Sequence, residues 1–159
     1  MVNILENETE EIISADKVLV AVGVQPNTDE IGLENIGVTT ENGFVSVGDN
    51  METNVTGVYA IGDVTGKMLL AHVASAQAVT AVEYIAGLNP TPLDYSLMPK
   101  AIYCEPQVAS FGITEEEAIN EGIEFQVGKF PFSASGKAIA LGHTEGCLLY
   151  TSDAADEGL

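Results

Sequence analysis

A glycine and a carboxylate at the end of an apolar run are the residues of this chain best suited to chemistry. Gly62 and Asp63 follow the run 57–61, which reads Gly-Val-Tyr-Ala-Ile and is typical of a strand. In an open α/β sheet, ligands bind beyond the carboxyl ends of the strands. Glycine lets a backbone approach a ligand there, and a carboxylate accepts hydrogen bonds from sugar-like hydroxyls. An ordinary turn after a strand has the same sequence, so both interpretations stay open here.

A helix is predicted to follow this turn, because residues 70–86 are rich in Ala and Val. Gly87 and Pro90 then supply the usual C-terminal stop signals. The segment is apolar almost all round, so we expect the helix to be buried. Its first backbone N–H groups, near Leu69, would face the same crevice as Asp63. Together with the helix dipole, they suit a ligand that carries partial negative charge.

The charge and composition of the chain exclude several classes of protein. Its 159 residues include 5 Lys+Arg and 24 Asp+Glu, for a net charge of −19 at pH 7. Neither nucleic acid nor an anionic membrane surface is expected as a partner, because both require a cationic face. An apolar content of 46% and a mean hydropathy of +0.20 exclude a disordered acidic chain. Two cysteines cannot form a disulfide framework, so we expect a cytoplasmic protein.

The elements that precede the turn are predicted to be short strands. Residues 2–13 indicate a hairpin whose turn lies at 6–8. The run 18–22 reads Val-Leu-Val-Ala-Val, which suits a strand that is covered on both faces. An Asn-Gly turn signal at 42–43 stands before the alternating strand 44–47.

After a linker at 89–92, with the sequence Asn-Pro-Thr-Pro, the character of the chain changes. Thr114 and Glu117 match a capping box, which predicts a short helix that ends at Gly122. Further strands are predicted at 101–103, 108–111, 124–130 and 137–141. These patterns indicate pieces of two or three architectures, and not one closed domain.

The last thirteen residues, 147–159, are expected to be a non-native tail, because they resemble the translated end of a sequencing adaptor. An ordinary acidic C-terminus is the alternative. With the tail set aside, Cys104 is the one remaining cysteine. We expect it to pack among apolar strand residues, since a reactive thiol needs electropositive neighbours. His143 has no acidic or Cys partner at motif spacing and is expected at the surface.

Three ordered motifs resemble those of the FAD-dependent pyridine nucleotide–disulfide oxidoreductases. Residues 53–63, Thr-Asn-Val-Thr-Gly-Val-Tyr-Ala-Ile-Gly-Asp, look like the second flavin-binding motif of that family. Residues 69–74 are similar to its continuation in the dihydrolipoamide (dihydrolipoyl) dehydrogenase branch. Residues 22–27 resemble the end of the NAD-binding domain, and residues 98–118 the opening of the interface domain. The resemblance covers about residues 2–146.

The resemblance implies cofactor contacts for a set of residues that consists of Gly23, Gly62, Asp63, Leu69, Leu70, Ala71 and His72. Asp63 would accept a hydrogen bond from the ribityl chain of FAD. Backbone amides of residues 69–72 would lie near the pyrimidine edge of the flavin, where the helix dipole would stabilise the reduced form. Gly23 would let the backbone approach NAD, although Val24 stands where the family often has Arg. No catalytic residue and no metal ligand is expected.

The fold class that the resemblance implies is α/β, with three partial domains. They are the end of the NAD-binding domain at 1–27, the C-terminal part of the FAD-binding domain at 28–97, and the first part of an α+β interface (dimerisation) domain at 98–146. The chain contains no Gly-x-Gly-x-x-Gly and no Cys-x4-Cys, and the His-Glu acid/base pair of the family is not found in it either.

The function implied by the resemblance is that of a dihydrolipoyl dehydrogenase, of which this chain is an inactive, truncated fragment. The intact parent would oxidise dihydrolipoyl groups with FAD and reduce NAD. It would be a homodimer and would act on a lipoyl-bearing protein of a 2-oxoacid dehydrogenase or glycine cleavage complex. One alternative is another member of the family, such as an NADH oxidase or a mercuric or glutathione-type reductase. The other is a stand-alone, non-catalytic α/β binding module.

Overall fold

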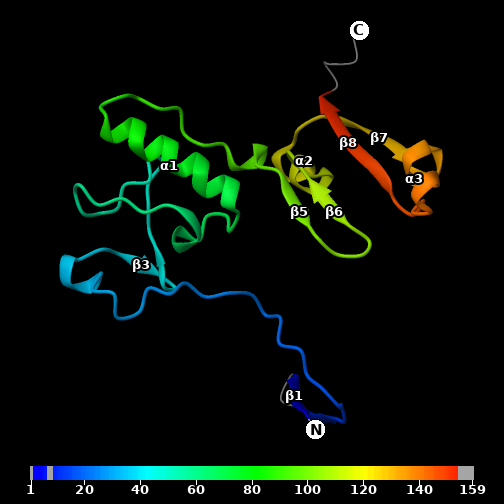
Figure 1. Ribbon diagram of the computed structural model, residues 1–159, viewed down its shortest axis with the longest axis horizontal. Helices are drawn as coiled ribbons and strands as arrows, with labels where there is room; N and C mark the ends of the chain where they lie inside the picture. The colour runs from blue at the N-terminus through cyan, green and yellow to red at the C-terminus, as the bar shows by residue number, and fades with distance from the viewer. Residues whose placement is uncertain (1, 7–8, 154–159) are drawn as a thin grey trace.

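The computed structural model describes residues 2–6 and 9–153, whose strands form four separate two-stranded antiparallel sheets. The first sheet pairs β1 (Val2–Glu6) with β2 (Thr9–Ile13), which confirms the predicted N-terminal hairpin. Two residues of its turn, 7 and 8, lie outside the described residues. Figure 1 shows this hairpin standing apart from the rest of the molecule, at the end of a long connecting segment.

The connecting segment includes residues 18–22, and the strand predicted there is wrong. No strand is assigned to this run, and none of the described strands pairs with it. Leu19 is 89% exposed and Val22 is 92% exposed. A strand satisfies its backbone N–H and C=O groups only when another strand lies beside it. The β-branched composition is therefore not sufficient for a strand here.

The second sheet is a tight hairpin of β3 (Thr40–Glu41) and β4 (Phe44–Val45), which follows the 3-10 helix η1 (Glu34–Ile36). Asn42 and Gly43 join the two strands with φ values of 51° and 84°. Positive φ at both central residues is what a type I′ turn requires, so the predicted Asn-Gly turn is confirmed. The strand after it ends at Val45, two residues earlier than predicted.

The run 57–61 is not the strand that its composition predicts. It folds back on residues 51–53 through two backbone hydrogen bonds, from Thr53 N to Val58 O (2.9 Å) and from Ala60 N to Met51 O (3.1 Å). One isolated bridge, between Glu52 and Tyr59, accompanies them. The described residues offer no longer strand for this run to pair with, so the run forms an irregular loop instead.

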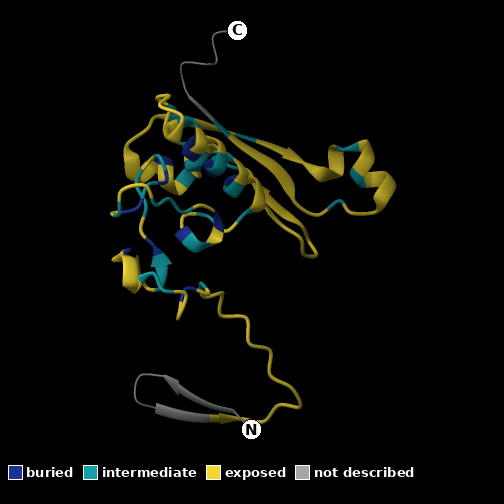
Figure 2. Cartoon of the chain, turned by 60° about the vertical axis from the view of Figure 1, so that its left-hand side comes forward, coloured by how far each residue is buried: buried dark blue, intermediate teal, exposed yellow. Residues whose placement is uncertain are grey.

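The helix predicted at 70–86 is confirmed as α1 (Ala71–Ile85), and Gly87, at φ 80°, follows its end. Only one stripe of the helix is buried, and it consists of Val73, Gln77, Thr80 and Ala81. Val79, Val82 and Ile85 are 58%, 64% and 59% exposed. The expectation of a fully buried helix is therefore wrong, because the chain covers α1 from one side only. Figure 2 shows the buried residues gathered around α1 and the loops beside it.

The linker leads through the 3-10 helix η3 (Tyr95–Leu97) to a third sheet, in which β5 (Lys100–Ile102) pairs with β6 (Val108–Ser110). A fourth sheet pairs β7 (Phe125–Pro131) with β8 (Cys147–Asp153). The strands predicted at 101–103, 108–111 and 124–130 are thus confirmed. Strand β8 is built from residues of the expected tail, of which 154–159 lie outside the described residues.

The capping box is confirmed at the start of α2 (Glu115–Glu121). The N–H of Glu117 donates to Thr114 Oγ1 (3.2 Å), and the N–H of Thr114 donates to Glu117 Oε2 (2.7 Å). The bond from the backbone N–H of Thr114, followed by the Thr114 side chain, holds the pKa of the Glu117 carboxyl below its ordinary value. Gly122 ends the helix at φ 70°, as predicted.

The strand predicted at 137–141 is wrong, since these residues belong to α3 (Gly136–Leu141), which follows the 3-10 helix η4 (Phe132–Ala134). The hydroxyl of Ser135 accepts a hydrogen bond from Ala138 N (3.4 Å) and caps the start of α3. Gly142 ends the helix at φ 74°. Both capping signals were present in the sequence and outweigh the alternation of Lys, Ala, Ile, Ala and Leu. Among the described residues, no helix combines the length and the apolar character that crossing a membrane requires.

Candidate functional site

The turn at Gly62 and Asp63 lies against the beginning of α1. It forms the 3-10 helix η2 (Gly62–Thr65), in which Gly62 is buried and has a φ of 77°. A Cβ atom at Gly62 would lie 3.4 Å from the Cβ of Ala74, in the first turns of α1. The left-handed backbone therefore favours glycine here, while the distance to Ala74 is an ordinary van der Waals contact. The structure thus brings the predicted turn to the predicted helix end.

Both backbone groups of Gly62 are held by buried side chains. Its N–H donates to Gln77 Oε1 (2.6 Å), and its carbonyl accepts from Thr65 Oγ1 (2.8 Å). Gln77 is 0% exposed, and its Nε2 donates to the hydroxyl oxygen of Tyr95 (3.0 Å). The amide of Gln77 therefore has a partner at each end.

The carboxylate of Asp63 is presented to the outside. Asp63 is exposed, and within the described residues its side chain makes no hydrogen bond and no ion pair. It caps neither η2 nor α1, since neither helix has a side-chain cap. Its backbone carbonyl accepts from Gly66 N (3.0 Å), which closes the turn. The carboxylate thus keeps its capacity to accept hydrogen bonds from a ligand.

The N-terminus of α1 presents backbone donors beside this acceptor. Leu70 is the N-cap residue in an extended conformation, and no side chain caps the helix. The first hydrogen bond into the helix is donated by Ala74 N to Leu70 O (3.0 Å). The N–H groups of Ala71 and His72 consequently have no acceptor in the helix, and no acidic residue stands in its first turn. A 15-residue helix with such an end attracts partial negative charge.

Two further contacts tie this end of α1 to the segment that leads into β5. His72 Nε2 lies 2.9 Å from the carbonyl oxygen of Pro99, so its ring is turned toward the linker. Lys67 Nζ lies 6.0 Å from the ring centroid of Tyr95. Asp94 begins η3 by accepting from Ser96 Oγ (2.6 Å) and Ser96 N (2.9 Å), and these bonds lower the pKa of the Asp94 carboxyl. The segment beside the helix end is therefore anchored.

Sequence reasoning missed Thr65, Gln77 and Tyr95. The signal for Gln77 was present, because a polar residue on the buried stripe of an apolar helix needs hydrogen-bond partners. Its partners could not be read from the sequence, since Gly62 and Tyr95 are 15 and 18 residues away from it.

Gly23 is not brought to the other candidate residues. It lies in the exposed connecting segment at φ 104°, and a Cβ atom there would meet no atom within 4 Å. The neighbouring Val24 is 68% exposed. The described residues alone therefore do not build a nucleotide contact around Gly23.

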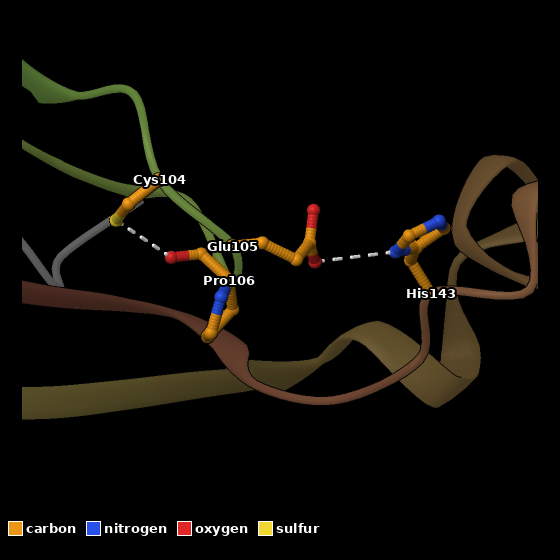
Figure 3. A network of polar contacts seen from close by, with 4 residues as sticks. All are labelled: Cys104, Glu105, Pro106 and His143. Carbon is orange, nitrogen blue, oxygen red and sulfur yellow. Dashed lines mark hydrogen bonds and ion pairs between the residues drawn. The ribbon is translucent and has the colours of Figure 1, made fainter. Parts of the chain in front are cut away.

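A second polar network joins the β5–β6 loop to the chain after α3, as Figure 3 shows. Cys104 Sγ donates to Pro106 O (3.0 Å), and His143 Nδ1 lies 3.5 Å from Glu105 Oε1. His143 is exposed, as predicted, but the packed position expected for Cys104 is wrong. The hairpin that carries Cys104 is exposed along both strands, because none of the described residues forms a second layer over it. The described residues contain no group of three or more side chains that could hold a metal ion.

Comparison with protein families gives two matches in chain order. Residues 2–78 match a family described as pyridine nucleotide-disulphide oxidoreductase. Residues 98–157 match the dimerisation domain of the same family. The second match therefore covers strand β8 as well as the strands and helices before it.

Curated relatives are similar to most of the chain. A dihydrolipoyl dehydrogenase from Bacillus subtilis (strain 168) is 50% identical over 140 residues, which are 88% of this chain and 30% of the relative. One from Chlorobaculum tepidum is 48% identical over 152 residues, which are 96% of this chain and 32% of the relative. The chain thus spans about a third of the length of these relatives.

The structure is also similar to a solved one. The HOCl-induced flavoprotein disulfide reductase RclA from Escherichia coli superposes with a TM-score of 0.80 at 25% sequence identity. The superposition covers 95% of this chain and 35% of the reductase. The α/β fold class and the order of partial domains expected from the sequence agree with both sets of matches.

Proposed function

Since this chain belongs to the pyridine nucleotide-disulphide oxidoreductase family, we propose that the protein of which it is a part is an FAD-dependent dihydrolipoyl dehydrogenase. The family implies FAD and NAD as cofactors. Relatives that carry this name are 50% and 48% identical to the chain. The observation that carries the proposal is the pairing of the uncapped end of α1 with the outward carboxylate of Asp63.

The residues at this end of α1 fit the flavin by their donor and acceptor chemistry. Asp63 accepts a hydrogen bond from a hydroxyl of the ribityl chain. Of residues 69–72, Leu70 already donates its N–H to Met68 O (3.0 Å), so the open N–H groups of Ala71 and His72, together with the dipole of α1, would stabilise the part of the flavin that becomes negative on reduction. FAD, when bound, supplies the two-electron chemistry that no side chain of this chain can provide. The residues of this chain would bind FAD, hold it in position and stabilise its reduced form.

The remaining features of the parent are part of the same proposal. Residues 1–27 end the NAD-binding domain and include Gly23 at the nucleotide, residues 28–97 belong to the FAD-binding domain, and residues 98–146 open the dimerisation domain. Residues 147–159 form a non-native tail. The parent is a cytoplasmic homodimer, and a lipoyl-bearing protein of a 2-oxoacid dehydrogenase or glycine cleavage complex is its partner. The match to a dimerisation domain supports the homodimer.

Another disulfide reductase of the family is the second candidate. The similarity to the E. coli flavoprotein disulfide reductase favours it, but the sequence identity of 25% is half that of the dihydrolipoyl dehydrogenases. A stand-alone binding module is disfavoured by the exposed apolar residues of α1 and of the connecting segment, which need a covering layer.

The test is to obtain the full-length gene and its product. We expect a Cys-x4-Cys pair and two Gly-x-Gly-x-x-Gly fingerprints upstream of residue 1, and NAD reduction that depends on dihydrolipoamide. Glutathione disulfide and mercuric ion are tested separately as alternative substrates. A full-length protein that reduces glutathione disulfide or mercuric ion but does not oxidise dihydrolipoamide would favour another disulfide reductase of the family. A gene without the cysteine pair would refute the proposal.

The 159-residue chain alone is expected to be inactive in the same assay. Its only cysteines, Cys104 and Cys147, are both exposed and are not spaced as a redox pair. NAD reduction above a protein-free control would contradict this expectation.

A further inference from the structure

The side chain of Gln77 is a buried polar group for which the proposed cofactor contacts give no role. It lies in the middle of α1 and is 0% exposed, as is Val73 on the same stripe. An amide buried without partners destabilises the fold, so a polar residue at such a position must be matched by specific donors and acceptors. Gln77 has one donor partner, the N–H of Gly62, and one acceptor partner, the hydroxyl oxygen of Tyr95.

The donor and acceptor chemistry fixes which way the amide of Gln77 points. The backbone N–H of Gly62 can only donate, so the oxygen of the amide must face it, at 2.6 Å. The nitrogen of the amide then donates to Tyr95 Oη, at 3.0 Å. The side chain thus joins η2 on one side to η3 on the other, and η3 lies between the two segments that match the family models.

The target of this hydrogen bond is the residue immediately before Asp63. Gly62 has a φ of 77°, and its carbonyl is also bound, by Thr65 Oγ1. The direction in which the chain leaves Gly62 sets the position of Asp63. Because two buried side chains hold Gly62 from opposite sides, Asp63 reaches the outside from a fixed backbone, although its own side chain makes no hydrogen bond within the described residues.

We propose that Gln77 is a positioning residue, which holds Gly62 in its left-handed conformation and thereby preorganises the Asp63 end of α1 for the flavin. This inference rests on the proposed function. It assigns to Gln77 no contact with the flavin, and it differs from a packing role because it depends on the amide oxygen and not on the volume of the side chain.

The experiment uses the full-length protein with FAD and three variants. Gln77→Met keeps the size of the side chain but removes the acceptor. Gln77→Glu keeps an acceptor for Gly62 N–H, while the hydroxyl of Tyr95 donates to the second carboxylate oxygen. Val73→Ala is the matched control, since it disturbs the same buried stripe without touching the hydrogen bond. The FAD dissociation constant and the melting temperature of the flavin-free protein are measured for each.

Gln77→Met is expected to raise the FAD dissociation constant roughly tenfold or more, because Gly62 N–H loses its buried acceptor. Gln77→Glu should restore affinity to within about threefold of the wild type, since a carboxylate accepts the same bond. Val73→Ala should lower the melting temperature but change the dissociation constant by less than about twofold, because it removes packing from the stripe and no hydrogen bond to Gly62. An unchanged dissociation constant in Gln77→Met, or an equal rise in Val73→Ala, would overturn the proposal.

A second readout does not require flavin. Hydrogen exchange at Gly62 N–H in the flavin-free protein should accelerate by about tenfold or more in Gln77→Met, but not in Gln77→Glu or Val73→Ala. Equal exchange rates in all variants would overturn the inference. If Gln77→Met does not fold, Thr65→Val removes the other bond to Gly62, and it should weaken FAD binding if positioning of Gly62 matters. A wild-type protein that binds no FAD would instead refute the proposed function, so the two failures are distinct.

Discussion

The core region (28–86) and the C-terminal region (98–153) differ in how their elements are stabilised. The core region buries whole side chains, and Met51 is 1% exposed while Val73 and Gln77 are 0% exposed. In the described part of the C-terminal region, Ala118 is the one buried residue. Figure 2 shows this contrast, with buried residues around α1 and exposed residues along β5 to β8. Local hydrogen bonds are thus sufficient to define elements, but only a second layer makes a core.

The C-terminal region has apolar side chains that could fill a core. Phe130 on β7 is 47% exposed, Ile102 on β5 is 60% exposed, and Phe111, which follows β6, is 65% exposed. Its match to a dimerisation domain suits this pattern, because a partner surface buries such side chains. Because residues 98–146 are proposed to be only the first part of that domain, we attribute the missing core to the remainder of the domain and to the homodimer that we propose for the parent. The core region, in contrast, carries its own packing.

The largest difference in stability between the core region and the C-terminal region is expected when a buried side chain is truncated. Met51→Ala should destabilise the core region by about 2–5 kcal/mol, because it leaves a cavity in place of a side chain that is 1% exposed. Ile102→Ala in β5, which is 60% exposed, is the matched change and should cost less than about 0.5 kcal/mol. Hydrogen exchange of peptides from each region, followed in increasing urea, measures both values. Equal losses would mean that the two regions share one core.

A smaller effect is expected from the capping box of α2. Thr114→Ala removes the side-chain acceptor for Glu117 N–H and should destabilise α2 by about 0.5–2 kcal/mol. Since α2 has little packing beneath it, the change should appear in amide exchange of Glu115–Glu121 and leave the protection of α1 unaltered. A parallel loss of protection in α1 would contradict the independence of the two regions.

The smallest effect is the pH dependence of the same helix. The hydrogen bonds from Thr114 lower the pKa of Glu117 below its ordinary value of 4.5 in the folded chain. The carboxylate therefore stabilises α2 fully above the unfolded pKa, and this contribution is lost as the pH falls through the lower, folded pKa. Amide protection of α2, corrected for intrinsic exchange, should decline between about pH 6 and about pH 3 in the wild type. In Glu117→Gln this part of the decline should be absent, and a persisting decline would assign it to other groups.

The sequence predicted those elements whose signals are local. The Asn-Gly turn at 42–43, the α1 helix and the Thr114–Glu117 box each carry their own hydrogen-bond partners within a few residues. The strand expected at 137–141 is wrong although the local capping signals of α3, Ser135 and Gly142, were present. Two other wrong predictions fall where the outcome depends on distant chain. The strands expected at 18–22 and 57–61 have no long neighbour among the described residues, and apolar composition cannot replace one.

The residues of the candidate site also divide into those that lie close in sequence, which were predicted, and those that only the folded chain brings together, which were missed. Residues 62–63 and 69–72 are close in sequence, and the packing of Gly62 on α1 joins them. Gln77 and Tyr95 were missed because their contacts depend on how the helix and the linker fold back. Gly23 depends on the nucleotide-binding domain, of which only the end is expected in this chain. The roles of all these residues toward FAD and NAD stay predictions that binding experiments must test.

The central claim, that the Asp63 end of α1 binds the flavin, is tested most directly by Asp63→Ala in the full-length protein. Hydrogen bonds to charged groups contribute roughly 1.5–3 kcal/mol, so the FAD dissociation constant should rise by about one to two orders of magnitude. The melting temperature of the flavin-free protein should hardly change, because the exposed Asp63 carboxylate caps neither η2 nor α1. An unchanged dissociation constant, with equal losses of melting temperature in the flavin-free and flavin-bound forms, would show that Asp63 is structural and contradict the claim.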